Sequence, residues 1–356
     1  MRTVLSHPMR CHASLVRVAS AVVLTLCILG FGKPASADKV SPASLDLEGR
    51  ELDDTALALI LRTRGLSALN LSRTEVTDAM LGGLASIPSL EVVELRGCRV
   101  GPAEAATLSR FPRLRTLDLS GAQGADGSSA FLFLAKAPSL EELRLMCNYT
   151  NDRDLLDISK LPLLRVLRIV SAEMSDDGLD HLAGAKSLRT LELSGDPRRI
   201  SRQGVRFLRG LGELRELTLR VRGLDGRWLA SVSRLERLEL LDASGTKVSN
   251  DDLAMIASLP CLAELDLNGC EVDDRGLTTI AELPALHVLQ LGHTKITERG
   301  GDALSRMKQL KRLDLFGTPI ARSTDGIRRL RELLPTVEIN ADLSTRASSK
   351  ATTQGK

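Results

Sequence analysis

Aromatic side chains are scarce in this sequence, which has 6 Phe, 1 Trp and 1 Tyr among 356 residues. Single-stranded nucleic acids bind proteins partly by stacking their bases on aromatic rings, and this chain offers few such rings. Positive and negative charges are nearly balanced, with 48 Lys and Arg against 45 Asp and Glu, so the formal net charge is +3. Neither property favours a nucleic acid or an anionic membrane surface as a partner. We therefore expect no nucleic-acid partner.

Groups that carry out chemistry are also few. After the first 37 residues the histidines are His181, His287 and His293, and they lack the His-x-x-x-His spacing of a helical metal site. The sequence contains no Gly-x-Ser-x-Gly nucleophile elbow. No stretch outside the periodic region described below is long enough for a catalytic fold. The sequence therefore predicts no enzyme, no catalytic residue, no cofactor and no metal.

The chain also lacks an apolar run long enough to span a membrane. The run Val18–Phe31 has about 14 residues, whereas a transmembrane helix needs roughly 20. Three arginines and no acid precede it, and Ala35-Ser36-Ala37 follows, which is the layout of a secretory signal peptide. We expect residues 1–37 to be removed and the protein to be exported to the periplasm or the exterior, without stable membrane insertion. An uncleaved anchor is the alternative.

Leucine recurs at regular intervals through the rest of the chain. In residues 262–285, LAELDLNGCEVDDRGLTTIAELPA, positions 1, 4, 6 and 11 are apolar, and the same slots are apolar when the window moves by 24 residues. The step is 26 residues at two places, and a terminal half repeat begins at Leu334. A period sustained in this way determines the architecture. The repeats begin at Pro42, Leu66, Leu90, Leu114, Leu140, Leu164, Leu188, Leu214, Leu238, Leu262, Leu286 and Leu310.

Each repeat combines two shorter periods. Leu265 and Leu267 alternate with polar residues, as in a strand with one buried face. Leu277, Ile280 and Leu283 recur three residues apart, as on one face of a helix. One repeat alone cannot bury its apolar face, but stacked repeats share a continuous core with strands on one side and helices on the other.

The pattern LxxLxL, followed by a small or polar residue, resembles a leucine-rich repeat over residues 42–340. The helical second half and the junctions Thr74–Asp78 and Thr246–Asp251 are similar to the cysteine-containing, F-box-associated type and to related 24-residue bacterial repeats, although no F-box is found. The resemblance implies an α/β horseshoe of about 12 repeats plus a terminal strand, with parallel strands on the concave face and helices on the convex face. It also implies that the solenoid binds other proteins. We assign residues 38–340 to the solenoid and 341–356 to a disordered tail.

Two of the cysteines occupy the ninth position of a repeat, slot 9, and their spacing indicates whether they can form a disulfide. Slot 9 holds Cys98 and Cys270, but threonine in four other repeats, where we expect hydroxyls to satisfy the turn amides. Cys98 and Cys270 are seven repeats apart, roughly 30 Å at about 4.8 Å per strand, which is too far for a disulfide. We expect buried free thiols, including that of Cys147. A bond between Cys261 and Cys270 is the pairing that this reasoning leaves open.

Slots 3, 5 and 7 are expected to point from the concave face, because side chains alternate along a strand. Slot 5 forms a mainly acidic column interrupted at its middle by Arg144 and Arg168. One interpretation is that these charges are habitual in such repeats and are simply solvated, although stacked like charges are mildly destabilising. The column reads Asp46, Asn70, Glu94, Asp118, Arg144, Arg168, Glu192, Thr218, Asp242, Asp266, Gln290, Asp314 and Glu338.

The other interpretation of this face is a protein-binding site. Arg144 and Arg168 lie beside Met146 and Val170 of slot 7, and interface centres are enriched in Arg and Met. Phe316, the only aromatic residue in these slots, would be a second anchor. Replacing the two central arginines by Glu is then expected to abolish binding and to leave thermal unfolding nearly unchanged. The hypothesised contacts are Arg96, Arg144, Met146, Arg168, Val170, Arg220 and Phe316.

Two functions therefore fit the sequence. The first is a secreted or periplasmic protein-protein interaction module whose concave strand face binds a partner. The second is a structural or assembly component of the cell envelope without a specific ligand on that face. The sequence does not specify the partner's identity or the oligomeric state, and a hydrolase or ligase with an appended repeat domain is disfavoured because no catalytic domain is left over.

Overall fold

The structure is a computed structural model that describes residues 43–122, 136–146 and 150–341. All of these residues belong to one compact unit, Val40–Lys356. The signal peptide predicted at residues 1–37 lies outside the described residues, and so does the predicted tail beyond Ala341. Both stay predictions.

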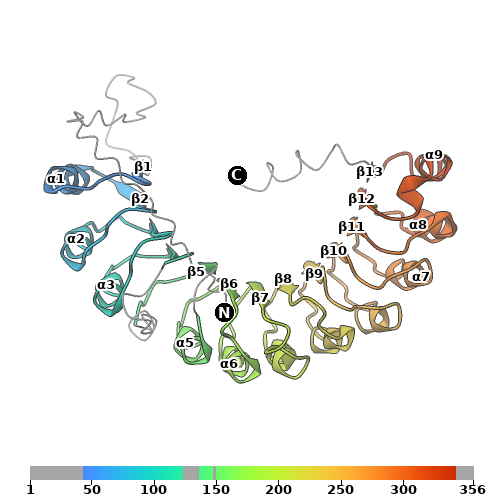
Figure 1. Ribbon diagram of the computed structural model, residues 1–356, viewed down its shortest axis with the longest axis horizontal. Helices are drawn as coiled ribbons and strands as arrows, with labels where there is room; N and C mark the ends of the chain where they lie inside the picture. The colour runs from blue at the N-terminus through green and yellow to red at the C-terminus, as the bar shows by residue number, and fades with distance from the viewer. Residues whose placement is uncertain (1–42, 123–135, 147–149, 342–356) are drawn as a thin grey trace, which may run out of the picture. The chain divides into compact units, whose positions relative to one another are not determined.

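Within this unit the described residues form one sheet of 13 strands, and neighbouring strands are parallel and follow one another in chain order. Figure 1 shows the strands along the inner side of a curved array and the helices along its outer side. The strands β1 and β13 each have one neighbour, so the sheet is open. The predicted α/β horseshoe is confirmed. The strands are β1 (Ala43–Asp46), β2 (Leu66–Asn70), β3 (Val92–Glu94), β4 (Thr116–Asp118), β5 (Glu142–Met146), β6 (Val166–Ser171), β7 (Thr190–Gly195), β8 (Glu216–Arg220), β9 (Leu240–Asp242), β10 (Glu264–Asp266), β11 (Val288–Gln290), β12 (Arg312–Asp314) and β13 (Glu338–Asn340).

Short helices on the outer side connect the strands, and several of them are 3-10 helices. The α-helices are α1 (Asp54–Arg62), α2 (Asp78–Leu84), α3 (Pro102–Leu108), α5 (Asp152–Ile158), α6 (Asp176–His181), α7 (Gly276–Ile280), α8 (Gly301–Arg306) and α9 (Thr324–Leu333). The 3-10 helices are η1 (Leu182–Gly184), η2 (Gly204–Gly210), η3 (Gly226–Ser231), η4 (Asp251–Met255), η5 (Glu298–Gly300) and η6 (Ile320–Arg322).

The strands pair slot against slot except at the two ends of the sheet: Ala43 of β1 pairs with Leu66 of β2, one slot out of register, and the last strand is shifted too. Asp314 of β12 pairs with Asn340 of β13, whereas Glu338 pairs with Arg312. Asn340 therefore occupies slot 5 of the last strand, and the assignment of Glu338 to this slot was wrong. The reason is that the last step is 26 residues long, from Asp314 to Asn340, rather than 24.

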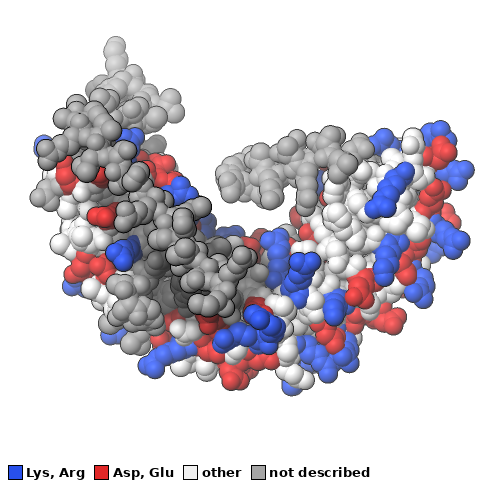
Figure 2. Space-filling view, viewed as in Figure 1, with Lys and Arg blue, Asp and Glu red and all other residues white. Residues whose placement is uncertain are grey.

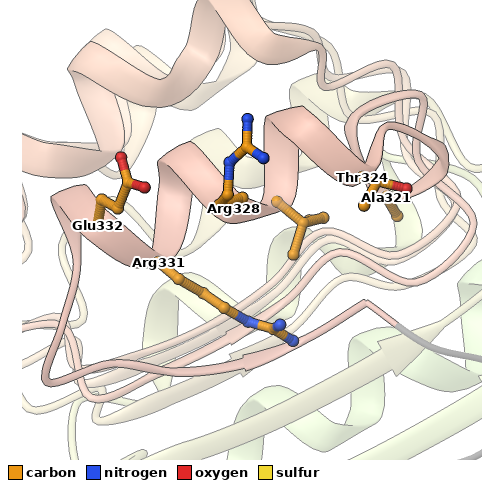
Figure 3. A pocket seen from close by; sticks show the side chains of 6 residues that line it. Ala321, Thr324, Arg328, Arg331 and Glu332 are labelled. Carbon is orange, nitrogen blue, oxygen red and sulfur yellow. The ribbon is translucent and has the colours of Figure 1, made fainter.

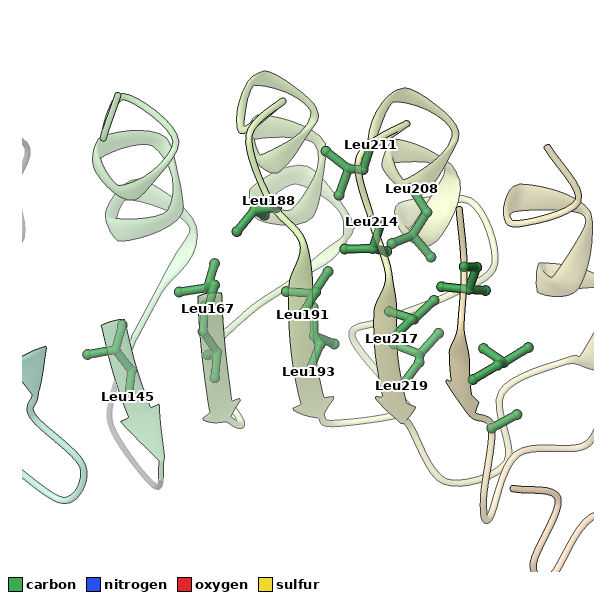
Figure 4. Close-up of a cluster of buried hydrophobic side chains, with 14 of the residues drawn as sticks. Leu145, Leu167, Leu188, Leu191, Leu193, Leu208, Leu211, Leu214, Leu217 and Leu219 are labelled. Carbon is green, nitrogen blue, oxygen red and sulfur yellow. The ribbon is translucent and has the colours of Figure 1, made fainter. Parts of the chain in front are cut away.

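The core consists of the repeated leucines. Leu188, Leu191 and Leu193 in slots 1, 4 and 6 are 0%, 1% and 0% exposed, and their counterparts in the adjacent repeats pack beside them (Figure 4). Burying one leucine side chain stabilises the folded state by roughly 1.5–3 kcal/mol. One cluster of buried apolar residues extends from Leu47 to Leu334. The repeats therefore share a single core, as the period predicted.

Polar residues at the helix starts join each repeat to the next. The carboxylate of Asp176 accepts hydrogen bonds from the backbone N and the Oγ of Ser201 at 2.7 and 2.5 Å. Asp274 accepts equivalent bonds from Thr297 at 2.8 and 2.5 Å. The carboxylate of Asp273 accepts a hydrogen bond from the backbone N of Arg275, the residue before α7, at 2.9 Å. Aspartates at one helix start thus also fix the start of the following one.

Glycine is required where one of these carboxylates meets the next helix. A Cβ on Gly178 of α6 would collide with Oδ1 of Asp152 and would lie 2.7 Å from its Cα. This same carboxylate accepts hydrogen bonds from the backbone N and the Oγ of Ser175 at 2.8 and 2.6 Å. The close approach therefore serves a polar contact between two repeats, and a side chain at Gly178 would disrupt it.

The threonines of slot 9 donate to carbonyl oxygens, whereas we expected them to bond to turn amides; only Thr318 also accepts from a described backbone amide, that of Ala321 at 3.4 Å. The Oγ1 of Thr246 donates to the carbonyl of Ala243 at 2.6 Å, and Thr318 donates to Leu315 at 2.5 Å. The turn amides have another partner, described below. The hydroxyl faces the carbonyl because both lie inside the same turn, three residues apart.

The described cysteines are free thiols, and no bond joins Cys261 to Cys270. Cys98 and Cys270 are buried as predicted, whereas Cys261 is exposed. Burial raises the pKa of the Cys270 thiol to about 12, so it is protonated and unreactive at neutral pH. Cys147 lies outside the described residues.

Candidate functional site

The sheet's inner face brings four of the predicted contact residues together. Strand β5 carries Arg144 and Met146, and β6 carries Arg168 and Val170. The strands pair so that Arg144 lies opposite Arg168 and Met146 lies opposite Val170. All four side chains are partly exposed. We call this group of four residues the central patch.

The remaining predicted contacts lie on the same face at increasing distance from the central patch. Arg96 follows β3, and Arg220 ends β8, so they flank the patch on either side. Phe316 follows β12, six strands beyond β6, and therefore belongs to a different part of the face.

The two central arginines share one carboxylate. The Nε of Arg144 lies 2.8 Å from Oε1 of Glu142, and Nη1 of Arg168 lies 2.7 Å from the same oxygen. The arginine side chains are 33% and 32% exposed, and that of Glu142 is 20% exposed. Glu142 thus holds both guanidinium groups in place, with part of each still in contact with solvent.

Further ion pairs extend from this centre in both directions. Asp118 lies 3.8 Å from Arg144 and 3.4 Å from Arg96. On the other side, Glu192 lies 3.5 Å from Arg168 and 3.7 Å from Arg220. The resulting row of alternating charges, which we call the charge ladder, crosses seven strands from β3 to β9. Its members are Glu94, Arg96, Asp118, Glu142, Arg144, Arg168, Glu192, Arg220 and Asp242.

The charge ladder alters the effect on stability that we expect from replacing Arg144 and Arg168 by glutamate. Glutamates at Arg144 and Arg168 would place two carboxylates beside Glu142, with Asp118 and Glu192 close by. The sequence alone suggested that this double substitution leaves thermal unfolding nearly unchanged. The ion pairs lead us to expect a loss of stability instead, because like charges on adjacent strands destabilise a sheet.

The acidic column of slot 5 also has a structural role. Oδ1 of Asp118 accepts a hydrogen bond from the backbone N of Ser120 at 2.9 Å, and Asp242 accepts one from Ser244 at 2.9 Å. Both aspartates are buried, at 2% and 5% exposure, so the solvated interpretation is wrong for them. These carboxylates are the partners of the turn amides. An asparagine can do the same, since Asn70 accepts from the backbone N of Ser72.

Beyond Asp242 the inner face has acids without ion-pair partners. Within the described residues, no ion pair involves Glu264, Asp266 or Asp314. Burial, and secondly the charge of Asp242, raise the pKa of Asp266 to about 6. The ionised form of Asp266 is therefore disfavoured in the folded protein relative to an aspartate in the unfolded chain.

Phe316 lies at the edge of this acidic region against His293. The two rings are 5.0 Å apart and nearly perpendicular, at 81°. His293 has a φ of 58°, in the left-handed region that favours glycine. Gly269 and Gly317 occupy the same slot 8 in the adjacent repeats, also at positive φ. Sequence reasoning missed this slot, although its recurring glycines were visible.

Comparisons with known proteins agree with this geometry. Residues 258–281 match a family model described as Leucine Rich repeat. Among the solved structures, an internalin (inlF) from Listeria monocytogenes str. 4b F2365 is similar, with a TM-score of 0.57 and 22% identity over 77% of this chain and 74% of that chain. The fold is a leucine-rich-repeat solenoid.

Two further solved structures resemble the solenoid. A leucine-rich-repeat protein of Leptospira interrogans has a TM-score of 0.43 and 17% identity, over 83% of this chain and 95% of that chain. The TLR13–ssRNA13 complex has a TM-score of 0.48 and 19% identity, over 77% of this chain and 49% of that chain. A search of curated protein sequences gave no match.

A pocket of about 480 Å³ lies at the C-terminal end of the solenoid, along α9 (Figure 3). Helix α9 is on the outer side of the array, away from the strand face (Figure 1). Arg328 at the pocket is bonded to Asp325 at 2.7 Å. None of the predicted contact residues lines this pocket. The lining residues are Ala321, Thr324, Ile327, Arg328, Arg331 and Glu332.

Figure 2 shows basic and acidic residues interspersed over the visible face of the solenoid. In residues 43–122, 136–146 and 150–341, no group of three or more His, Cys, Asp or Glu is placed to hold a metal ion. Over the same ranges, every helix is too short or too polar to cross a lipid bilayer.

Proposed function

We propose that this leucine-rich-repeat solenoid is an exported, non-enzymatic interaction module, periplasmic or extracellular, that binds a protein partner through its inner strand face. The observation that carries the proposal is the pairing of β5 with β6, which gathers two arginines and two apolar side chains into the central patch. Arginine and methionine are enriched at the centres of protein interfaces, and a few such residues supply most of the binding energy. We expect neither a cofactor nor a nucleic acid.

The central patch is suited to binding because its arginines are already held in place. Arg144 and Arg168 are bonded to Glu142, so partner binding would immobilise them at a small additional entropy cost. Their solvent-facing N–H groups can still donate to a carbonyl or carboxylate of a partner. Met146 and Val170 add apolar area beside them. We therefore expect a partner surface that combines hydrogen-bond acceptors with an apolar anchor.

The proposal is tested by capture of a partner from the native envelope or culture medium with residues 38–356 as bait. Met146→Ser combined with Val170→Ser should weaken capture at least tenfold, about 1.4 kcal/mol, because both substitutions remove apolar contact area. Leu156→Ser with Leu163→Ser is the matched control, since these leucines are 38% and 44% exposed away from the inner strands. Equal capture by all three baits would refute the central patch.

One observation favours a second candidate, a structural or assembly component of the envelope. The charge ladder satisfies its own charges, so the inner face from β3 to β9 is stable without a ligand. Recovery of no partner with the wild-type bait, from both the envelope and the medium, would favour this candidate.

We also propose that the repeats are of the cysteine-containing type. Cys98 and Cys270 occupy the slot at which that type carries cysteine, and both are buried. The Sγ of Cys270 is 3.3 Å from the carbonyl of Ala243 in the preceding repeat, so the thiol contributes to the contact between repeats. Cys270→Ala should therefore lower the melting temperature measurably, whereas Cys261→Ala, at an exposed position, should not.

A further inference from the structure

The inner-face slots contain fewer arginines in the C-terminal third of the sheet than in its middle. On β3 to β9 each slot-5 carboxylate forms an ion pair with an arginine. On β10 to β12 the inner-face slots carry Glu264, Asp266 and Asp314, with Arg312 as their cation. Arg312 is bonded to Glu338 at 3.2 Å. Over the described residues the three acids therefore have no intramolecular counter-charge in contact with them.

Apolar side chains lie among these acids. Glu264 pairs with Leu240 on one side and with Val288 on the other, so its carboxylate is flanked by two hydrocarbon groups. Asp314 accepts a hydrogen bond from the backbone N of Phe316 at 2.8 Å, and the aromatic ring of Phe316 is half-buried. A carboxylate attracts a cation through its charge, and an aromatic ring attracts one through its quadrupole, so both residues favour a cationic partner.

We propose that the inner face of β10 to β12 is a docking surface for a cationic, extended segment of the protein partner, with one Lys or Arg against Glu264 and Asp266 and a second against Asp314 and Phe316. This inference rests on the proposed function, because it specifies the chemistry of the partner at a place other than the central patch. Charge complementarity selects the occupant: an acidic segment would be repelled, and an uncharged one would leave the carboxylates uncompensated.

The charges of the unbound face support this choice. Asp242 and Asp314 on the same face disfavour the ionised form of Asp266, while Arg220 favours it. The positive charge of Arg220 is already engaged by Asp242 at 2.5 Å and by Glu192 at 3.7 Å. A lysine or arginine from outside would therefore relieve a repulsion that the solenoid does not relieve by itself.

The strand spacing predicts how the two cations are separated. Asp266 and Asp314 are two strands apart, about 9.6 Å at about 4.8 Å per strand. A polyproline II segment rises about 3.1 Å per residue and turns once every three residues, so its side chains repeat on one face after about 9.3 Å. In a β-strand the same-face repeat is about 6.7 Å. A Lys-x-x-Lys segment in the polyproline conformation fits this surface best.

The test uses a labelled peptide, Lys-Pro-Pro-Lys-Pro-Pro-Lys, titrated against residues 38–356 at pH 7.5 and low ionic strength. Glu264→Gln, Asp266→Asn and Asp314→Asn together should weaken binding at least tenfold. The asparagines keep the acceptor oxygen that slot 5 requires, as Asn70 does for Ser72, so the triple variant should fold normally. Circular dichroism and the melting temperature check this.

The control removes three acids elsewhere, by Asp251→Asn, Glu282→Gln and Asp302→Asn, all at exposed positions. Its affinity should stay within twofold of the wild type. An equal loss in both triple variants would reduce the effect to net charge and overturn the proposal. Failure of the wild type to bind the peptide would overturn it too, as would binding of Ca²⁺ alone at the same acids.

The peptide assay separates this inference from the proposed function. The central-patch variant Met146→Ser with Val170→Ser should bind the peptide as the wild type does, because β5 and β6 lie four or more strands from β10. If a captured partner depends on the central patch but the peptide shows no dependence on the three acids, the proposed function holds and this inference fails. The converse result supports the acidic surface and refutes the central patch.

Discussion

The inner strand face contains two regions that differ in charge but share one scaffold. Strands β3 to β9 carry a charge ladder in which arginines and carboxylates alternate, whereas β10 to β12 carry acids without such partners. Strand pairing and buried leucines are the same in both regions. The comparison shows that the leucine slots determine the fold and leave slots 3, 5 and 7 free to vary. Under the proposed function, these three columns are where we expect specificity to be encoded.

The largest change in the free energy of unfolding is expected for glycines that lie in close contact with the preceding repeat. Substituting one such glycine beside each region shows whether the contacts between repeats are equally tight in both. Gly178→Ala should lower the free energy of unfolding by about 3 kcal/mol or more, because its Cβ would meet the backbone of Asp152. Gly300→Ala, in the acidic region, should cost less, since its Cβ would meet side-chain atoms of Leu277 and Asp274 at 2.6 and 2.8 Å. Urea denaturation measures both.

Gly82→Ala is the control for these glycine substitutions. Gly82 lies inside α2, and no atom lies within 4 Å of the place where an added methyl group would stand, so alanine meets no neighbour there. This substitution should raise the free energy of unfolding by about 0.5–1 kcal/mol through helix propensity. Similar destabilisation at all three positions would contradict the close-contact explanation.

The next effect concerns the charge ladder itself. Arg144→Glu with Arg168→Glu should lower the free energy of unfolding by about 3 kcal/mol, because ion pairs of up to about 1 kcal/mol each are replaced by repulsions of similar size. Arg144→Gln with Arg168→Gln should be less destabilising by about 1 kcal/mol, since the pairs are lost without new repulsion. Unchanged melting of the glutamate variant would show that the ladder contributes nothing to stability.

The effect expected for Asp266→Asn has the opposite sign to those of the arginine variants and belongs to the acidic region. The folded protein raises the pKa of Asp266 from 3.8 to about 6, so it binds more protons than the unfolded chain over this range. The stability that this proton uptake provides is present below about pH 4 and is lost as the pH rises through about 6. Asp266→Asn should therefore stabilise the protein at pH 7.5, by about 2 kcal/mol at most for a partly exposed group.

The pH dependence provides the control for this last substitution. At pH 4 the wild-type aspartate is largely protonated in the fold, so the difference between the Asn variant and the wild type should nearly vanish. Melting temperatures measured from pH 4 to pH 8 would show whether the gap widens near pH 6. A gap that is constant with pH would mean that the charge of Asp266 is not the cause.

The sequence predicted the parts of this molecule that depend on apolar period. Leu265 and Leu267 identified a strand, and the step of 24 residues placed Arg144 beside Arg168 and Met146 beside Val170. These inferences succeed because burying a leucine face fixes both strand register and side-chain direction. The last strand shows the limit, since an irregular step moved Asn340 into the slot assigned to Glu338.

The polar contacts could not be predicted in the same way. Whether Arg144 is free or bonded depends on the rotamers of Glu142 and Asp118, which no spacing in the sequence specifies. The bond from Asp242 to the amide of Ser244 is equally invisible, because an aspartate at this slot reads as an exposed charge. The glycines of slot 8, such as Gly269 and Gly317, recur with the repeat and indicate a turn with positive φ. This feature could have been found from the sequence and was overlooked.

Because each strand of the sheet meets only the strands before and after it, the solenoid can be shortened one unit at a time. Deleting residues 238–261 would remove one complete repeat, including β9. The remaining repeats would keep their alignment, so that β8 becomes the neighbour of β10. Arg220 would then face Asp266 in place of Asp242. Deleting one repeat would thus place a cation at the border of the acidic region, and no residue of the acidic region would be substituted.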